Sequence, residues 1–242
     1  MIITNPNIQI LETAAERLRT LTEEMVFVGG CATGLLLTDP AASPVRATID
    51  VDVLVEVATL VEYHWLSEQL RQLGFVEDTS EDAPICRWKT YDVILDVMPT
   101  DPDILGFGNR WFTLAYEASE WTTLPSGKRI RLLPTPYFLA TKLEAFESRG
   151  ESDYLMSRDM EDIITVLDGR SEIVSEVHQA DEELKNYLVE RCSMLLEERD
   201  FLDALPGHLL PDAASQDRSA LIIDRLKTIA GFRSFKGGVI PP

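Results

Sequence analysis

The chain of 242 residues carries 41 acidic and 22 basic side chains and has a formal net charge of -19. This excess of negative charge disfavours nonspecific binding to nucleic acid or to anionic lipid, so a nucleic-acid partner would need a local basic patch. Hydrophobic residues make up 45% of the sequence, which is typical of a globular protein with a full core and excludes a largely disordered chain.

The cysteines are odd in number and widely spaced, which indicates neither a disulfide framework nor a CxxC metal site. They are Cys31, Cys86 and Cys192. The N-terminal stretch shows no basic segment followed by an apolar run, and no apolar stretch approaches the length of a membrane span. We therefore expect a cytoplasmic protein with reduced thiols and no membrane partner.

The N-terminal part of the sequence alternates between helix-like and strand-like patterns. Over residues 8–21 apolar side chains recur at helical spacing, which predicts an amphipathic helix. Residues 47–57 are rich in valine and predict a long strand. The other elements expected here are a strand over residues 25–30 that stops at glycines, a helix over 31–37, a proline-containing loop over 38–46, and a helix over 59–73 that ends at Gly74.

Further along the chain, the pattern changes from mixed to helical near residue 133. Before that point we expect strands over residues 85–90 and 92–99, a short helix over 109–118, and a hairpin over 121–134. From residue 136 to about residue 232 the spacing is helical. The sequence therefore predicts an α+β fold, with a mixed sheet and flanking helices in residues 1–133 and an all-helical domain in residues 134–242.

Two aspartates stand within the apolar strand of residues 47–57. Asp50 and Asp52 are two positions apart, so their side chains project from the same face, whereas Val51 and Val53 project into a core. A divalent cation would relieve the repulsion between the two carboxylates. Mg²⁺ is usually bound by one or two carboxylates completed by substrate phosphates. We therefore expect Asp50 and Asp52 to hold Mg²⁺, with a half-solvated strand face as the plain alternative.

Gly29 and Gly30 stand where the preceding strand meets a predicted helix. Glycine lets the backbone approach a phosphate closely, and a helix N-terminus offers free N–H groups and a partial positive charge. Alone, such a pair would more often be an ordinary turn. Together with the two aspartates it predicts a site for a nucleoside triphosphate and its metal. Cys31, which follows the glycines, is expected to be a packing residue.

A third carboxylate is expected on a neighbouring strand. In the strand over residues 92–99, Asp92 and Asp96 project from the same face. Asp96 lies deeper in the apolar run and is the better candidate, while Asp92 belongs to the turn. If Asp96 is the third ligand, it can orient or deprotonate an attacking hydroxyl.

These motifs, taken in order, resemble the DNA polymerase β-like nucleotidyltransferase superfamily. After residue 133 the sequence resembles the AbiEii/AbiGii-type toxin family, whose members carry a Lys-Leu-x-Ala segment and then an Arg-Asp segment on helices. Here these segments begin at Lys142 and at Arg158, and the run from Arg46 through Thr48 to Asp52 also looks like that family. The resemblance spans roughly residues 25–168. Gly30 stands where many relatives have Ser.

The resemblance implies a nucleotidyltransferase-fold domain with a helical domain that completes the cleft. It implies a Mg²⁺-dependent enzyme that moves an NMP from an NTP to an acceptor hydroxyl and releases pyrophosphate. The acceptor in the family is often RNA, particularly tRNA, and the protein is often the toxin paired with a cognate antitoxin. The implied catalytic metal ligands are Asp50, Asp52 and Asp96. The implied nucleotide-binding residues are Gly29, Gly30, Thr48, Lys142 and Asp159, with Asp162 competing for the role of Asp159.

The charge distribution leaves the acceptor open. Residues 171–203 hold ten acidic and three basic side chains, and such a surface would repel RNA. The hairpin offers Lys128, Arg129 and Arg131 as an RNA contact, and other basic side chains are expected around the cleft. A small-molecule or protein acceptor therefore stays in consideration, as does a non-catalytic module that binds a nucleotide or a partner. Lys142 taken alone would be a solvent-facing lysine.

Overall fold

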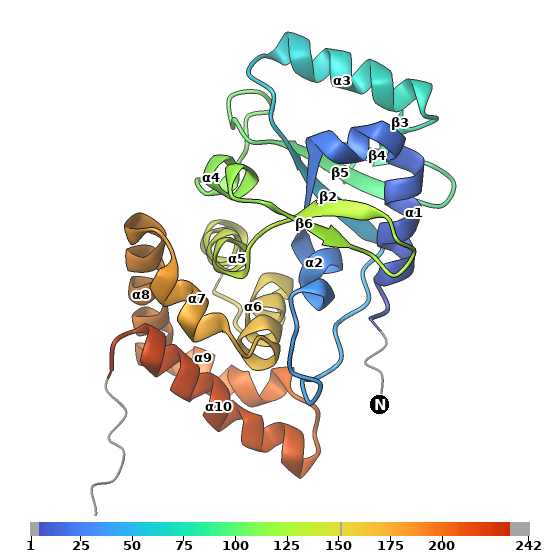
Figure 1. The fold of residues 1–242 in the computed structure, drawn as a ribbon. Helices are drawn as coiled ribbons and strands as arrows, with labels where there is room; N and C mark the ends of the chain where they lie inside the picture. Colours follow the sequence, from blue (N-terminus) through green and yellow to red (C-terminus); the bar gives the residue numbers. More distant parts are fainter. Residues whose placement is uncertain (1–4, 151, 233–242) are drawn as a thin grey trace, which may run out of the picture.

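A mixed seven-stranded sheet forms the centre of the N-terminal part of the protein (Figure 1). The computed structural model describes residues 5–150 and 152–232. The strands follow the order β3-β4-β5-β2-β1-β7-β6 across the sheet, and the β2–β5 and β1–β7 pairs are parallel. The strand bounds are β1 Met25–Val28, β2 Asp50–Val55, β3 Val76–Glu77, β4 Arg87–Lys89, β5 Ile94–Pro99, β6 Glu120–Thr123 and β7 Arg129–Leu132.

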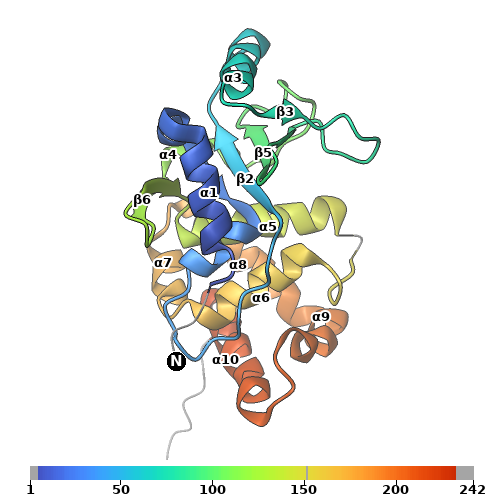
Figure 2. The same ribbon diagram turned by 90° about the vertical axis from the view of Figure 1, so that its right-hand side faces the viewer.

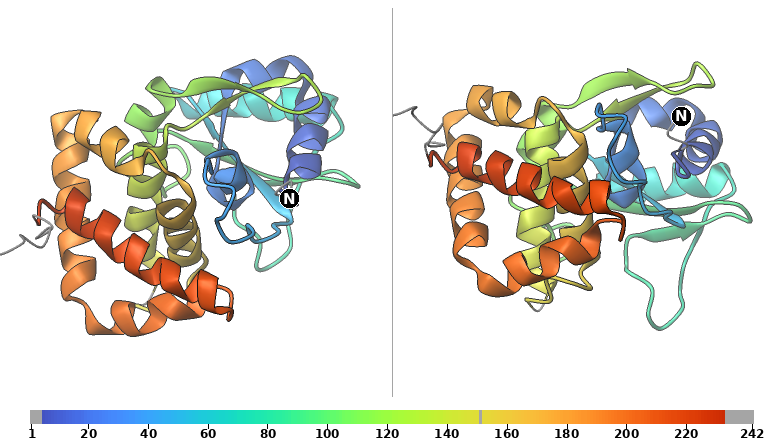
Figure 3. Two further views of the ribbon diagram at one scale, coloured as in Figure 1. Left: turned by 60° about the horizontal axis from the view of Figure 1, so that its bottom comes forward. Right: turned by 90° about the horizontal axis from the view of Figure 1, so that it is seen from below.

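Helices cover both faces of this sheet and make up the regular structure of the C-terminal part (Figures 1 and 3). The α-helices are α1 Ile8–Leu18, α2 Gly29–Ala32, α3 Leu60–Gln72, α4 Phe112–Glu117, α5 Thr135–Arg149, α6 Arg158–Gly169, α7 Ile173–Gln179, α8 Glu182–Glu197, α9 Arg199–Ala204 and α10 Ala213–Ile229. Short 3-10 helices cover Arg19–Glu24, Thr33–Leu35 and Leu205–His208. The predicted α+β class is therefore confirmed.

Strand alternation sorts the apolar side chains into two cores. On one face of the sheet, Phe27, Val51 and Val53 pack under α1 and α3. On the other face, Val26 and Leu54 pack with side chains of α5 and α6. Because Asp50 and Asp52 alternate with Val51 and Val53, the two aspartates share the second face with Leu54.

The second core runs without interruption across the predicted boundary at residue 133. It joins Val26 and Leu54 of the sheet to buried residues of α5, α6, α8 and α10, such as Phe138, Ile163 and Leu226. Apolar burial is the main favourable contribution to folding. The sheet and the C-terminal helices therefore depend on each other for much of their stability. The division into two domains at this point stays a prediction.

Several elements differ from the expected bounds. The strand predicted over residues 47–57 is shorter, because the segment before Asp50 bonds to Asn7 rather than to a neighbouring strand. The helix predicted over residues 31–37 is instead the four-residue α2, which begins at Gly29, followed by a 3-10 turn. The strand β3 was not predicted. Its two residues pair with β4, and the loop that joins β3 to β4 projects from the sheet (Figure 2).

Cys31, Cys86 and Cys192 are all buried and free. None of the helices in the described part of the chain is long and apolar enough to cross a membrane.

Candidate active site

Four side chains stand in one row across neighbouring strands, at the point where β1 ends. Asp52 on β2 lies opposite Val28 on β1 and opposite Asp96 on β5. Arg87 on β4 lies opposite Asp96 in turn. Since partners in register project from the same face of a sheet, Arg87, Asp96 and Asp52 face the C-terminal helices together.

The three predicted carboxylates are brought together by this pairing. Asp50 and Asp52 are partly exposed, whereas Val51 and Val53 between and beside them are fully buried. Asp96 is buried, with 6% of its surface exposed. Asp92 lies apart from the site, because its carboxylate forms an ion pair with Arg17 at 2.8 Å. The structure thus places Asp96, and not Asp92, beside Asp50 and Asp52.

The glycine pair lies directly against these residues. Gly29 has a φ of +70°, and a Cβ atom there would stand 1.8 Å from Oδ2 of Asp52. A Cβ at Gly30 would stand 2.9 Å from the Arg46 guanidinium and 3.3 Å from Asp162. Both positions are therefore packed by the site's own side chains. Since α2 has only four residues, the expected helix N-terminus is too short to provide much of a dipole for binding phosphate.

Asn7 holds the glycine segment and the Arg46–Thr48 segment in place. Its side-chain amide donates to the backbone carbonyls of Arg46 at 3.0 Å and Gly30 at 3.4 Å. Its Oδ1 accepts from the backbone N–H of Thr48 at 3.0 Å. Asn7 is fully buried, so these bonds replace its contacts with water. Sequence reasoning missed this residue, since nothing in its surroundings marks a long-range role.

A network of charged side chains forms the wall opposite the sheet. Nζ of Lys142 lies 3.0 Å from Asp159 and 2.7 Å from Asp162. Asp159 also accepts from Arg149 at 3.0 Å, and Asp162 lies 3.4 Å from Arg46. The Lys142 side chain is only 11% exposed, so the interpretation as a solvent-facing lysine is wrong. Asp159 and Asp162 share the same lysine, which is why the sequence did not separate their roles.

The charges in this wall and on the sheet shift one another's pKa values. Burial alone would lower the pKa of Lys142, but Asp162 and Asp159 outweigh burial and raise it. Burial acts to raise the pKa of Asp159, yet Lys142 and Arg149 bring it below its ordinary value. Asp52 keeps some exposure to solvent, but the protein around its carboxyl desolvates it and raises its pKa to about 7. Lys142 opposes that shift, and the nearby Asp50 and Asp96 add to it.

Arg87 is a second residue of the site that sequence reasoning did not identify. Its Nε and Nη2 donate to the two oxygens of Asp96 at 2.8 and 2.7 Å, and Nη2 also donates to Asp50 at 3.0 Å. The hydrogen bond to Asp96 raises the pKa of the guanidinium further. The alternation around the buried Trp88 could have placed Arg87 on the carboxylate face, but only the strand register shows which carboxylate it meets.

A cleft of about 480 Å³ opens above the carboxylates, between the sheet and the α5–α6 region. Thr48 and Gly30 line it, together with five basic and five acidic side chains. The whole chain has almost twice as many acidic as basic residues, so the cleft is locally enriched in positive charge. The charged residues are Arg46, Arg87, Lys142, Arg149, Arg158, Asp50, Asp52, Asp96, Asp153 and Asp159.

Arg158 is an exposed cation of this wall. Among the described residues it makes no ion pair, unlike the other four basic side chains of the cleft. It starts α6, where Ser157 caps the helix by accepting from the backbone N–H of Met160. A guanidinium with no carboxylate partner at the mouth of a cleft suits an incoming anion.

A second lobe of about 280 Å³ continues the cleft on the far side of Asp52. The two lobes share Asp52, Lys142, Arg149 and Asp159. The second lobe differs in character, because it is walled by apolar side chains of the β5–α4 region. These are Met98, Phe107 and Phe112.

The carboxylates fit Mg²⁺ by donor type, since oxygen ligands are those that this ion prefers. The arrangement of these carboxylates in the structure does not fit Mg²⁺. Asp50 and Asp96 are both bonded to Arg87, and among the described residues no group of three acidic, histidine or cysteine side chains is arranged to hold a metal ion. A cation could use this donor set only if Arg87 moved.

The basic residues of the hairpin do not line the cleft. Lys128 forms an ion pair with Glu16 at 3.2 Å. Arg129 and Arg131 stack on the aromatic rings of Trp121 and Tyr116, respectively. Their proposed contact with RNA would therefore lie away from the carboxylates.

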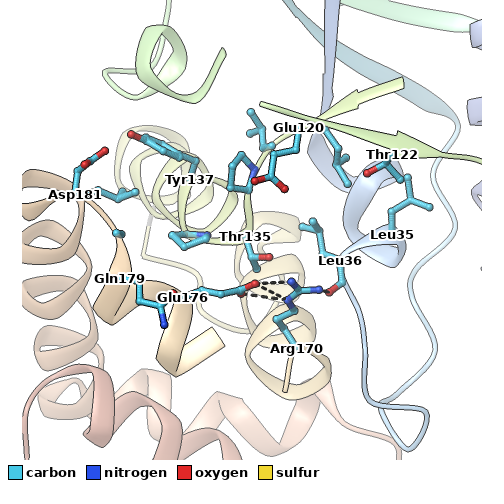
Figure 4. A pocket seen from close by; sticks show the side chains of 16 residues that line it. Leu35, Leu36, Glu120, Thr122, Thr135, Tyr137, Arg170, Glu176, Gln179 and Asp181 are labelled. Carbon is cyan, nitrogen blue, oxygen red and sulfur yellow. Dashed lines mark hydrogen bonds and ion pairs between the residues drawn. The ribbon is translucent and has the colours of Figure 1, made fainter. Parts of the chain in front are cut away.

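Another cavity, of about 380 Å³, lies between the β6–β7 hairpin and α7 (Figure 4). Its wall carries Glu120, Asp181 and Glu176, and the Arg170 guanidinium is already bonded to Glu176. It shares no lining residue with the carboxylate cleft. With three acidic side chains and one paired base, this cavity disfavours an anionic ligand, so the carboxylate cleft is the better candidate for the active site.

No family model matches the sequence. No curated protein matches it either. Among solved structures, the chain is similar to one described as a "putative nucleotidyltransferase from H. pylori", at 13% sequence identity and a TM-score of 0.46, over 96% of each chain.

Proposed function

We propose that this protein is a nucleotidyltransferase that moves an NMP from an NTP to an acceptor hydroxyl. The observation that carries this proposal is the placement of Asp50, Asp52 and Asp96 on one sheet face, at the floor of a cleft enriched in basic side chains. Carboxylates supply ligands for a divalent cation and a proton acceptor, while the basic wall supplies partners for phosphates. A pocket for an uncharged ligand would need neither.

The two lobes of the cleft match the two parts of a nucleotide. The lobe with Arg46, Arg149 and Arg158 suits the triphosphate, because guanidinium groups bind phosphate oxygens in a planar, bidentate manner. The apolar lobe with Phe107 and Phe112 suits the nucleoside, because a base presents an apolar face to aromatic side chains. Thr48 and Gly30 border the triphosphate lobe.

The proposed transfer replaces pyrophosphate by the acceptor oxygen at the α-phosphorus. The acceptor hydroxyl oxygen bonds to the α-phosphorus. The bond from that phosphorus to the oxygen that bridges the α- and β-phosphates breaks, and pyrophosphate leaves. The hydroxyl proton passes to a carboxylate. The carboxyl of Asp52 is suited to accept it, because among the described residues that carboxyl has no hydrogen-bond or ion-pair partner. Mg²⁺ on Asp50, Asp52 and Asp96 would neutralise charge on the phosphates.

For the acceptor we propose RNA, in particular tRNA, with the protein acting as the toxin of a toxin–antitoxin pair and meeting a cognate antitoxin. The motif order around Lys142 and Asp159 supports this choice. The hairpin with Lys128, Arg129 and Arg131 would then hold the RNA outside the cleft. The acidic surface of residues 171–203 favours the second candidate, a transferase for a small-molecule or protein acceptor.

The test is label transfer. The full chain is incubated with Mg²⁺ and each α-³²P-labelled NTP, in the presence of total tRNA, a small-molecule hydroxyl panel, or protein extract. Label on tRNA supports the first candidate, and label on another acceptor supports the second. Nucleotide binding without transfer would make the protein a binding module. Absence of both binding and transfer with every NTP would contradict the proposal.

A further inference from the structure

Arg87 neutralises the carboxylates that the proposed function assigns to the metal. Its guanidinium forms three hydrogen bonds of 2.7 to 3.0 Å with Asp96 and Asp50. Within the described part of the chain it is the only basic side chain in an ion pair with either carboxylate. The other buried base nearby, Lys142, is already held by Asp159 and Asp162.

We propose that Arg87 is an internal competitor for the divalent cation, which must displace its guanidinium from Asp50 and Asp96 before binding there. This inference rests on the proposed function for the identity of the site. Its physical basis is that a guanidinium and a metal ion seek the same carboxylate oxygens. A carboxylate whose two oxygens both accept from a fork of N–H groups offers few free lone pairs to a cation.

The position of Arg87 makes such a displacement feasible. Arg87 is the first residue of the three-residue strand β4 and follows the exposed β3–β4 loop. Its side chain is 20% exposed and lines the cleft. The guanidinium can therefore swing into solvent while the strand keeps its pairing with β5. A triphosphate entering with the metal would give the released guanidinium an anionic partner.

The same strand supplies a matched control. Lys89 is two residues further along β4, on the same sheet face, and also carries one positive charge. Its partner is Asp78, and it does not line the cleft. Replacing Lys89 by Met changes the local charge as much as replacing Arg87 by Met, but it leaves the carboxylates as they are.

The experiment measures Mn²⁺ binding to the full-length wild type, Arg87→Met and Lys89→Met by electron paramagnetic resonance of free Mn²⁺, without nucleotide. We expect Arg87→Met to bind Mn²⁺ roughly tenfold more tightly than wild type, which corresponds to about 1.4 kcal/mol. Lys89→Met should bind as wild type does. Equal affinity of Arg87→Met and wild type would overturn the inference, and so would an equal gain in Lys89→Met.

A second measurement covers the case in which Arg87→Met does not fold. Arg87→Lys keeps the charge but loses the bidentate contact, and it should show a smaller gain in Mn²⁺ affinity. In wild type, the ¹⁵Nε signal of Arg87 should shift on titration with Mg²⁺, because its partner at Nε is lost. An unchanged signal at saturating Mg²⁺ would overturn the inference.

The two proposals fail in different ways. If label transfer occurs while Arg87→Met and wild type bind Mn²⁺ equally well, only the competition is refuted. If neither protein binds Mn²⁺ and no label is transferred, both proposals fall.

Discussion

The buried Asn7 side chain bonds the backbone N–H of Thr48 at 3.0 Å, and thereby ties the start of the chain to the edge of the cleft. Asn7→Ala removes this bond and the two bonds to the carbonyls of Gly30 and Arg46. Leaving buried backbone groups unpaired costs about 1–3 kcal/mol. We expect a loss of that size in urea unfolding, together with weaker nucleotide binding. Asn186 in α8 is exposed, so Asn186→Ala is the control. Equal stability of the two variants would contradict this role of Asn7.

Asp52→Asn is expected to abolish nucleotidyl transfer while preserving the fold. The neutral amide is a poor ligand for Mg²⁺ and cannot accept the proton. Stability at neutral pH should be unchanged or higher, because the folded protein already disfavours the charged form of Asp52. Asp50→Asn should likewise abolish transfer. Asp92 lies outside the cleft, so Asp92→Asn is the control and should stay active. Full activity of Asp52→Asn would refute the role of Asp52 as a metal ligand and proton acceptor.

Lys142→Met is expected to lower both stability and nucleotide use. Removing one partner of a buried ion pair costs about 3–5 kcal/mol, and Lys142 holds two buried carboxylates. A stability loss alone therefore does not identify a purely structural role. The double variant Lys142→Met/Asp162→Asn separates the effects. It should recover part of the urea midpoint but none of the nucleotide binding; recovery of both would leave Lys142 with a structural role only.

Acid should erase the stability difference between wild type and Asp159→Asn. The pKa of Asp159 is lowered in the folded protein, so its charge stabilises the fold above the ordinary value of 3.8, and this contribution is lost as the pH falls through the folded value. We expect a clear difference in the free energy of unfolding at pH 7 that shrinks at pH values below 3.8. A difference that is constant over this range would show that the charge of Asp159 does not contribute.

Gly29→Ala is expected to disrupt the site more than its backbone conformation alone would explain. Gly29 and Gly74 both have positive φ, +70° and +88°, but a Cβ at Gly74 meets open space. Gly74→Ala should therefore show only the backbone strain, about 1–2 kcal/mol. Gly29→Ala should add displacement of the Asp52 carboxylate and loss of transfer. Similar unfolding midpoints and activities for the two variants would contradict the close packing of Gly29 on Asp52.

Local periodicity was sufficient for much of the fold. The alternation around Asp50 and Asp52 correctly gave the strand face, because a period of two is a property of the strand itself. The depth of Asp96 in its apolar run likewise favoured it over Asp92. The short β3 depends on its pairing with β4, and the true length of β2 depends on the bonds between Asn7 and the segment before Asp50. Neither contact shows in the local spacing of apolar residues.

The partners of the charged residues could not be predicted from the sequence either, because they are set by strand register and helix packing. Arg87 meets Asp96 through the β4–β5 register, and Lys142 meets Asp162 through the packing of α5 on α6. Neither contact follows from spacing along the chain. A lysine with this degree of burial would not be expected from composition, because burial of an amine becomes acceptable only when its carboxylate partners are in place.

The pairing of β2 with β5 has a consequence for the order of folding. Asp52 on β2 meets Asp96 on β5 only after α3, β3 and β4 have been spanned, and Lys142 on α5 comes later still. Closing such loops costs chain entropy before the contacts form, so parallel pairing of this kind is slow. The cleft should therefore be absent from early intermediates. A nucleotide that binds only the finished cleft would slow the unfolding rate and leave the folding rate unchanged.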